Sequence, residues 1–129
     1  IKEMTDTHNK IKELTGQKAT LFRPPFGDYS NTLITTCNES GYHVIQWDVD
    51  SLDWKDLSAS AIYDRVIGQI KPGSIVLFHN NGKHTGEALE PIIKELHNRG
   101  YKIVPISELL IKGDYYIDKS SGEMRKGKM

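Results

Sequence analysis

The chain has 129 residues, of which 37% are hydrophobic and 26% charged, a balance typical of a globular domain rather than a disordered segment. Seventeen basic and seventeen acidic residues give a formal net charge of +0, so the charge balance favours neither nucleic acid nor an anionic membrane surface as partner. No apolar run approaches the length of a membrane span. We therefore expect a neutral polymer or a small molecule as the ligand.

The first residues, 1–15, have hydrophobic side chains at helical spacing and predict an amphipathic helix that ends at Gly16. Because the chain opens on the pattern of a mid-helix and carries no signal peptide, we expect it to begin inside a domain. Further along, hydrophobic runs alternate with helical patterns. The predicted strands are 19–22, 43–47, 74–78 and 102–106. Helices are predicted at 31–40 and, as a short helix, at 107–110. Two more helices are predicted between them: the first is capped by Ser58 or Ser60 and ends at Pro72, and the second is capped by Thr85 and ends at Gly100.

Near-continuous apolar strands such as 74–78 are typical of a parallel sheet covered on both faces. The fold class predicted from this pattern is α/β, either open or a barrel. From Lys112 onward the composition shifts to Lys, Gly, Ser and Asp with little periodicity, so we expect residues 112–129 to form a mobile polar tail after a domain at 1–111. The single cysteine, Cys37, excludes an internal disulfide and fits a small buried hydrophobic residue better than a reactive thiol.

Polar residues follow three of the four predicted strands: Arg23, the Asp48 to Asp53 segment, and His79. In parallel α/β folds the loops after the carboxyl ends of the strands converge on one face, and that face carries the active site. His79 is the best candidate for an acid or base, with Asp50 or Asp53 as a partner that favours its charged form and fixes its tautomer. The alternative is a histidine held structurally at a strand end.

The other histidines are weaker candidates, because each is expected on a helix, at a strand start or in a loop: His8, His43, His84 and His97. The spacing of His79 and His84 is compatible with chelation, but no local carboxylate or thiol would complete such a site. Arg23 precedes two prolines that would stiffen its backbone for a bidentate grip on a carboxylate, although a surface ion pair is the alternative. Trp54 fits a pocket wall and a core residue equally well.

Three segments in this order resemble the last three of five motifs in polysaccharide deacetylases of carbohydrate esterase family four, the NodB-homology domain: Arg23-Pro24-Pro25-Phe26-Gly27, Asp50-Ser51-Leu52-Asp53-Trp54 and Ile75-Val76-Leu77-Phe78-His79. The resemblance extends to about Leu110. It implies that the chain is the C-terminal part of a distorted (β/α) barrel, and that the complete domain uses a divalent metal, commonly zinc, to hydrolyse N-acetyl groups on chitin-like or peptidoglycan sugars.

The resemblance also implies a role for each matching residue. His79 would be the general acid for the leaving amine, oriented by Asp53, and Arg23 would pair with a carboxylate base. The Phe26 backbone N–H would stabilise the oxyanion, and Trp54 and Leu77 would line the acetyl pocket, with Pro24 and Asp50 beside them.

The two family motifs that supply the base and the three metal ligands have no counterpart in this sequence. His8 lies in a predicted helix and should not be assigned as a metal ligand in their place. We therefore expect a piece of a metal-dependent hydrolase that binds no metal in the family's way and is inactive by itself. Two alternatives remain: a non-catalytic carbohydrate-binding or scaffold domain, and a half-barrel completed by its missing N-terminal part or by a second chain. Placement outside the cell or in the cell envelope follows only by family analogy.

Overall fold

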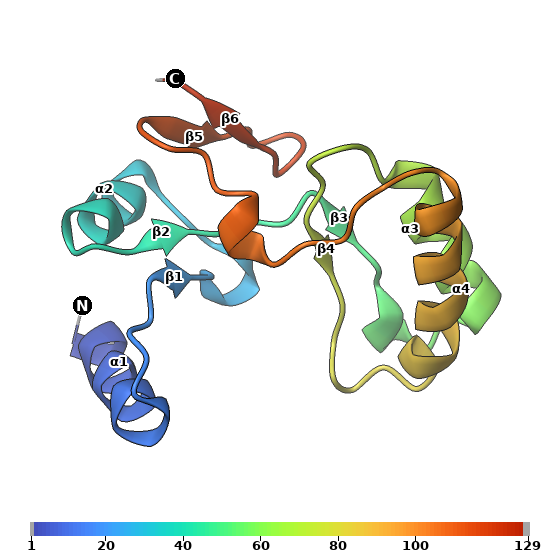
Figure 1. Cartoon of the computed structure of the whole chain (residues 1–129), viewed down its shortest axis with the longest axis horizontal. Helices are drawn as coiled ribbons and strands as arrows, with labels where there is room; N and C mark the ends of the chain where they lie inside the picture. The colour runs from blue at the N-terminus through green and yellow to red at the C-terminus, as the bar shows by residue number, and fades with distance from the viewer. Residues whose placement is uncertain (1, 128–129) are drawn as a thin grey trace. The chain divides into compact units, whose positions relative to one another are not determined.

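The computed structural model describes residues 2–127. The chain divides into two compact units, residues 1–46 and 47–129, and each is described by itself. Parallel strand pairs and covering helices confirm the predicted α/β class (Figure 1). No helix within the described residues is both long and apolar enough to cross a membrane.

The first unit contains α1 (Lys2–Thr15), β1 (Leu21–Phe22), a 3-10 turn (Pro25–Gly27), α2 (Asn31–Glu39) and β2 (His43–Val44). The β1 and β2 strands pair in parallel, and α2 connects them, as expected for a β-α-β unit. Ser30 caps α2 by accepting a hydrogen bond from the Leu33 N–H at 3.1 Å. Cys37 on α2 is 1% exposed, which confirms its prediction as a buried apolar residue.

The second unit contains β3 (Val49–Asp50), a 3-10 turn (Asp53–Lys55), α3 (Ala59–Gln69), β4 (Val76–Leu77) and α4 (Thr85–Asn98). The β3 and β4 strands pair in parallel, and α3 and α4 pack side by side (Figure 1). Their apolar faces meet β3 in one buried core. It consists of Val49, Ile62, Val66, Ile67, Ala88, Ile92 and Leu96.

The strands at 19–22, 43–47 and 74–78 are present but shorter than predicted, and β3 was not predicted as a separate strand. The strand predicted at 102–106 is absent: this segment is extended but pairs with no strand within residues 2–127, and a 3-10 turn follows at Ile106–Glu108. The prediction was wrong because hydrophobic alternation reports a buried face, whereas a strand also needs a neighbour with free backbone groups.

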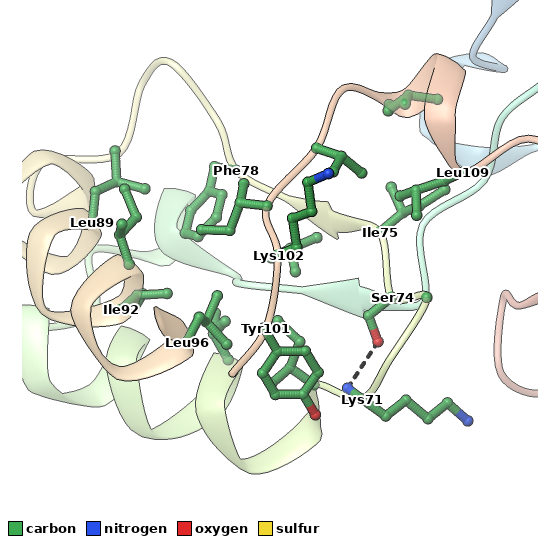
Figure 2. A pocket seen from close by; sticks show the side chains of 18 residues that line it. Lys71, Ser74, Ile75, Phe78, Leu89, Ile92, Leu96, Tyr101, Lys102 and Leu109 are labelled. Atoms are coloured by element: carbon green, nitrogen blue, oxygen red, sulfur yellow. Dashed lines mark hydrogen bonds between the residues drawn. The ribbon is translucent and has the colours of Figure 1, made fainter. Parts of the chain in front are cut away.

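The extended segment forms one wall of an apolar groove of about 340 Å³ in the second unit. Figure 2 shows Phe78 after β4, Leu89, Ile92 and Leu96 on α4, and Tyr101 after α4 around this groove. Lys71 at its edge donates its backbone N–H to Ser74 Oγ at 3.0 Å (Figure 2). Side chains from α3, β4, α4 and the segment after α4 therefore all line the groove.

The expected mobile tail is instead partly ordered, because β5 (Tyr115–Ile117) and β6 (Met124–Lys126) form an antiparallel hairpin. Ile117 is 2% exposed, and Lys71 and Glu123 form an ion pair between the hairpin and the loop after α3. The polar composition concealed this hairpin because a single buried apolar side chain gives no periodic signal. The predicted domain boundary at residue 111 stays a prediction.

Gly122 in the hairpin turn has φ +79°, and a Cβ there would collide with the carbonyl oxygen of Trp47. Gly127 has a comparable φ of +107° but open space around it. We predict that Gly122→Ala lowers the free energy of unfolding by clearly more than Gly127→Ala does. Both substitutions carry the left-handed backbone strain of about 1 kcal/mol, but only the first adds a clash with backbone.

Urea unfolding followed by tryptophan fluorescence would measure both losses, since both tryptophans lie in this unit. Equal losses for the two variants would contradict docking of the hairpin turn on the backbone at Trp47.

Candidate active site

The candidate site is built around Asp53, whose side chain is completely buried in the turn after β3. Leu52 and Asp56 on either side of this turn have φ values of 52° and 59°, in the left-handed region that ordinary residues adopt at a cost. Between these two residues Asp53 is buried, whereas Trp54 and Lys55 are exposed. The local backbone thus places a carboxylate where an apolar side chain would ordinarily lie.

His79 lies two residues after the end of β4 and contacts Asp53 through two of its own nitrogens. Its Nδ1 lies 2.7 Å from Asp53 Oδ1, and its backbone N–H donates to Asp53 Oδ2 at 2.9 Å. The parallel register that pairs Asp50 with Leu77 brings the ends of the two strands together. The positions of Asp50 and Asp53 in the sequence left both open as partners of His79, the family resemblance implied Asp53, and the structure shows the contact with Asp53.

Asp50 has a different set of contacts. Its side chain accepts the backbone N–H of Leu52 at 3.0 Å, and its carbonyl oxygen accepts a hydrogen bond from Arg65 Nε at 2.7 Å. Both contacts shape the loop that leads to Asp53. Asp50 therefore supports the backbone of the site and does not bind the imidazole.

Two further hydroxyl groups contact Asp53, and neither residue was predicted as part of the site from the sequence. Thr85 Oγ1 donates to Asp53 Oδ2 at 2.6 Å, and the fully buried Ser51 accepts the Asp53 backbone N–H at 3.4 Å through its Oγ. The prediction that Thr85 caps α4 was wrong, because His84 occupies the N-cap position and the Thr85 hydroxyl is engaged with Asp53. Only the fold shows that these residues converge on one carboxylate.

Burial acts to raise the pKa of Asp53, but hydrogen bonds from the His79 N–H, the Thr85 hydroxyl and the His79 ring outweigh it. The net effect lowers the pKa from its ordinary value of 3.8 to about 2. Asp53 is therefore a stable anion at neutral pH, which fixes the imidazole with Nδ1 as a donor and leaves Nε2 for a ligand. The His79 side chain is 29% exposed, so a ligand can reach the ring.

The remaining predicted residues of this unit lie at different exposures. Trp54 is 47% exposed, and the Lys55 ammonium lies 5.4 Å from its ring centroid. Leu77 on β4 is half-buried. An exposed tryptophan beside the buried Asp53 agrees better with a pocket wall than with a core residue.

Arg23, Pro24 and Phe26 belong to the first unit, so their distance from His79 stays a prediction. Pro24 is buried, Arg23 is exposed, and Arg23 forms no ion pair within residues 2–127. Phe26 is fully exposed and has φ 57°, ψ 12°, a strained conformation for a residue with a Cβ. Strain of this kind persists only where surrounding structure enforces it, as in the Pro24–Asp28 turn.

His8 and His84 each have a hydrogen-bond partner of their own. The His8 Nδ1 lies 3.1 Å from the Ala19 carbonyl oxygen, whereas the half-exposed His84 pairs with Glu87 at 3.2 Å. Within residues 2–127, no group of three or more His, Cys, Asp or Glu side chains is arranged to hold a metal ion. The side chains of residues 2–127 therefore do not by themselves fit the metal that the family resemblance implies.

The model of the polysaccharide deacetylase family matches residues 1–45. The chain is 36% identical over 109 residues to the peptidoglycan-N-acetylmuramic acid deacetylase PdaC of Bacillus subtilis, an alignment that covers 84% of this chain and 23% of that protein. It is also 33% identical over 128 residues to the peptidoglycan-N-acetylglucosamine deacetylase PgdA of Listeria monocytogenes, covering 96% of this chain and 27% of that protein.

Among solved structures, a carbohydrate esterase family four pseudoenzyme from Bacillus anthracis matches with a TM-score of 0.76 and 35% identity. That match covers 81% of this chain and 37% of the pseudoenzyme. The chain belongs to the polysaccharide deacetylase family. Its fold is accordingly part of the family's distorted barrel, and it spans only about a quarter of the length of the two curated relatives.

The low pKa of Asp53 predicts how stability depends on pH. Because the folded-state pKa lies below the ordinary value, Asp53 contributes stability that is present above about pH 4 and is lost as the pH falls towards 2. Asp53→Asn should therefore lower the free energy of unfolding by an additional amount on the order of 2 kcal/mol above pH 4, and this pH-dependent part should vanish near pH 2.

Urea unfolding of both proteins between pH 2 and 6 measures this difference. Asp118 in the hairpin also has a pKa lowered to about 2, mainly by hydrogen bonds from Ser120 and Ser121, but it is present in both proteins and cancels. A difference that does not change with pH would show that Asp53 is not held as the predicted anion.

Proposed function

We propose that this chain forms part of a hydrolase that removes N-acetyl groups from a cell-wall or chitin-like polysaccharide, with His79 as the general acid. The observation that carries the proposal is the pair of a buried anionic Asp53 and a solvent-accessible His79 at 2.7 Å. The names of the relatives PdaC and PgdA, both peptidoglycan deacetylases, indicate the substrate class. N-acetylmuramic acid and N-acetylglucosamine residues both remain candidates for the sugar.

In the proposed reaction, water adds to the amide carbonyl, the carbon–nitrogen bond breaks, and the products are acetate and a free amine. An amine leaves as a neutral group only if its nitrogen receives a proton as the bond breaks. His79 supplies that proton from Nε2, while Asp53 at Nδ1 stabilises the charged ring and keeps it oriented.

The other residues have supporting roles in this proposal. Trp54 and Leu77 line the pocket for the acetyl methyl group, with Pro24 and Asp50 beside it. The backbone N–H of Phe26 stabilises the oxyanion, and this role would explain why Phe26 adopts a strained backbone conformation. Arg23 pairs with a carboxylate base.

Activation of the water belongs to residues outside this chain in the proposal. The family resemblance implies a divalent metal, commonly zinc, for that step, bound by motifs that have no counterpart in this sequence. The site of action is the cell envelope or the extracellular space, since peptidoglycan is found there.

The family likeness to a pseudoenzyme supports a second candidate function, a domain that binds carbohydrate without cleaving it. The two functions differ in whether His79 takes part in chemistry. Binding of sugar oligomers by the full-length protein with no release of acetate at any concentration of added zinc would favour the second.

His79→Ala in the full-length protein should lower kcat for acetate release from an N-acetylglucosamine oligomer by about 100-fold or more, because general acid catalysis is lost. His84→Ala is the matched control, since His84 lies five residues later, is half-exposed and pairs with Glu87 rather than with Asp53. Its kcat should stay within about twofold of the wild type.

Circular dichroism would establish that both variants are folded. A His79→Ala protein that is folded and retains the wild-type rate would overturn the assignment of the acid.

A further inference from the structure

The two oxygens of the buried Asp53 carboxylate have separate partners. Oδ1 lies 2.7 Å from the His79 ring, whereas Oδ2 receives both the His79 backbone N–H at 2.9 Å and the Thr85 hydroxyl at 2.6 Å. A carboxylate with one free oxygen could rotate about its Cβ–Cγ bond and exchange the two positions. Two donors on Oδ2 prevent that exchange and reserve Oδ1 for the imidazole.

Thr85 is the first residue of α4, a position whose side chain commonly faces solvent or the helix end. Here the helix begins after His84, which provides no side-chain cap, and the Thr85 hydroxyl donates to Asp53. The hydroxyl therefore makes a short hydrogen bond to a buried anion instead of capping the helix.

Gly82 makes room for this contact. A Cβ at Gly82 would collide with Thr85 Oγ1 and would lie 3.1 Å from Asp53 Oδ2 and 3.2 Å from Asp53 Cβ. The loop between His79 and Thr85 thus passes over the carboxylate with space for a hydrogen atom only. Gly86, one helical position after Thr85, has nothing within 4 Å of the corresponding point.

We propose that Thr85 is a positioning residue for the acid His79, acting through Asp53, and that Gly82 provides the close approach that lets it do so. The inference rests on the proposed role of His79 and adds a third and a fourth residue to that pair. The Thr85 hydroxyl donates to Asp53 Oδ2 and not to the imidazole, so its effect passes through the orientation of the carboxylate.

Thr85→Val keeps the shape of the side chain and removes the hydroxyl, whereas Thr85→Ser keeps the hydroxyl. In the full-length protein we expect Thr85→Val to lower kcat for acetate release by about tenfold with KM within about twofold, because proton transfer is misaligned while the sugar contacts are unchanged. Thr85→Ser should restore kcat to within about twofold of the wild type.

A spectroscopic measurement on the present chain separates this inference from the proposed function. The His79 Nδ1–H should give a low-field proton resonance that exchanges slowly with water in the wild type and in Thr85→Ser. In Thr85→Val the same resonance should broaden or disappear. This measurement decides the positioning role even if the full-length protein releases no acetate, a result that would reject the proposed function alone.

Gly82→Ala should behave like Thr85→Val in both measurements, and Gly86→Ala should behave like the wild type. A Thr85→Val protein with an unchanged resonance and an unchanged kcat would overturn the proposal. If Thr85→Val does not fold, Thr85→Ser still decides: a folded serine variant that loses the resonance would show that the hydroxyl is not what positions Asp53.

Discussion

The second unit depends on one physical constraint: the carboxylate of Asp53 is fully buried and must remain an anion. An isolated buried carboxylate would take up a proton to avoid losing its hydration. Here a backbone N–H, a hydroxyl and an imidazole nitrogen replace the lost water. Three features of the backbone bring those donors close to the carboxylate: the left-handed residues Leu52 and Asp56, the parallel pairing of β3 with β4, and the glycine at position 82.

This constraint connects fold and chemistry directly. The donors come from His79, two residues after β4, and from Thr85 at the start of α4, so the anion connects segments that lie 26 and 32 residues after Asp53 in the sequence. The same anion orients His79 with its outer nitrogen available. A single buried charge thus organises the strand ends and supplies the electrostatic partner that an acid needs.

Much of this arrangement could be predicted from the sequence, because polar residues after apolar strands have no packing reason to be there. The alternation of helices and strands gave the α/β class, and the position of His79 after 75–78 gave the candidate acid. What could not be predicted depends on tertiary neighbours. The hydrogen bond from the Thr85 hydroxyl to Asp53 and the lack of a strand partner for 102–106 among residues 2–127 both depend on which groups come close in space.

The ordered hairpin at 115–126 escaped prediction for a related reason, because its docking relies on Ile117 and on a glycine against Trp47 rather than on a periodic pattern. Conversely, the sequence resemblance extended further than the described geometry does. The resemblance predicts that Arg23 and Phe26 share one cleft with His79, and this stays a prediction because Arg23 and Phe26 belong to the other compact unit.

We propose that this chain carries the proton-donating half of a deacetylase site and that the water-activating half is supplied by residues outside it. The most direct test measures bound zinc and acetate release from an N-acetylglucosamine oligomer for this chain alone and for a longer protein extended towards its N-terminus. We expect bound zinc and acetate release for the longer protein only. Zinc-dependent acetate release by the 129-residue chain alone would contradict it.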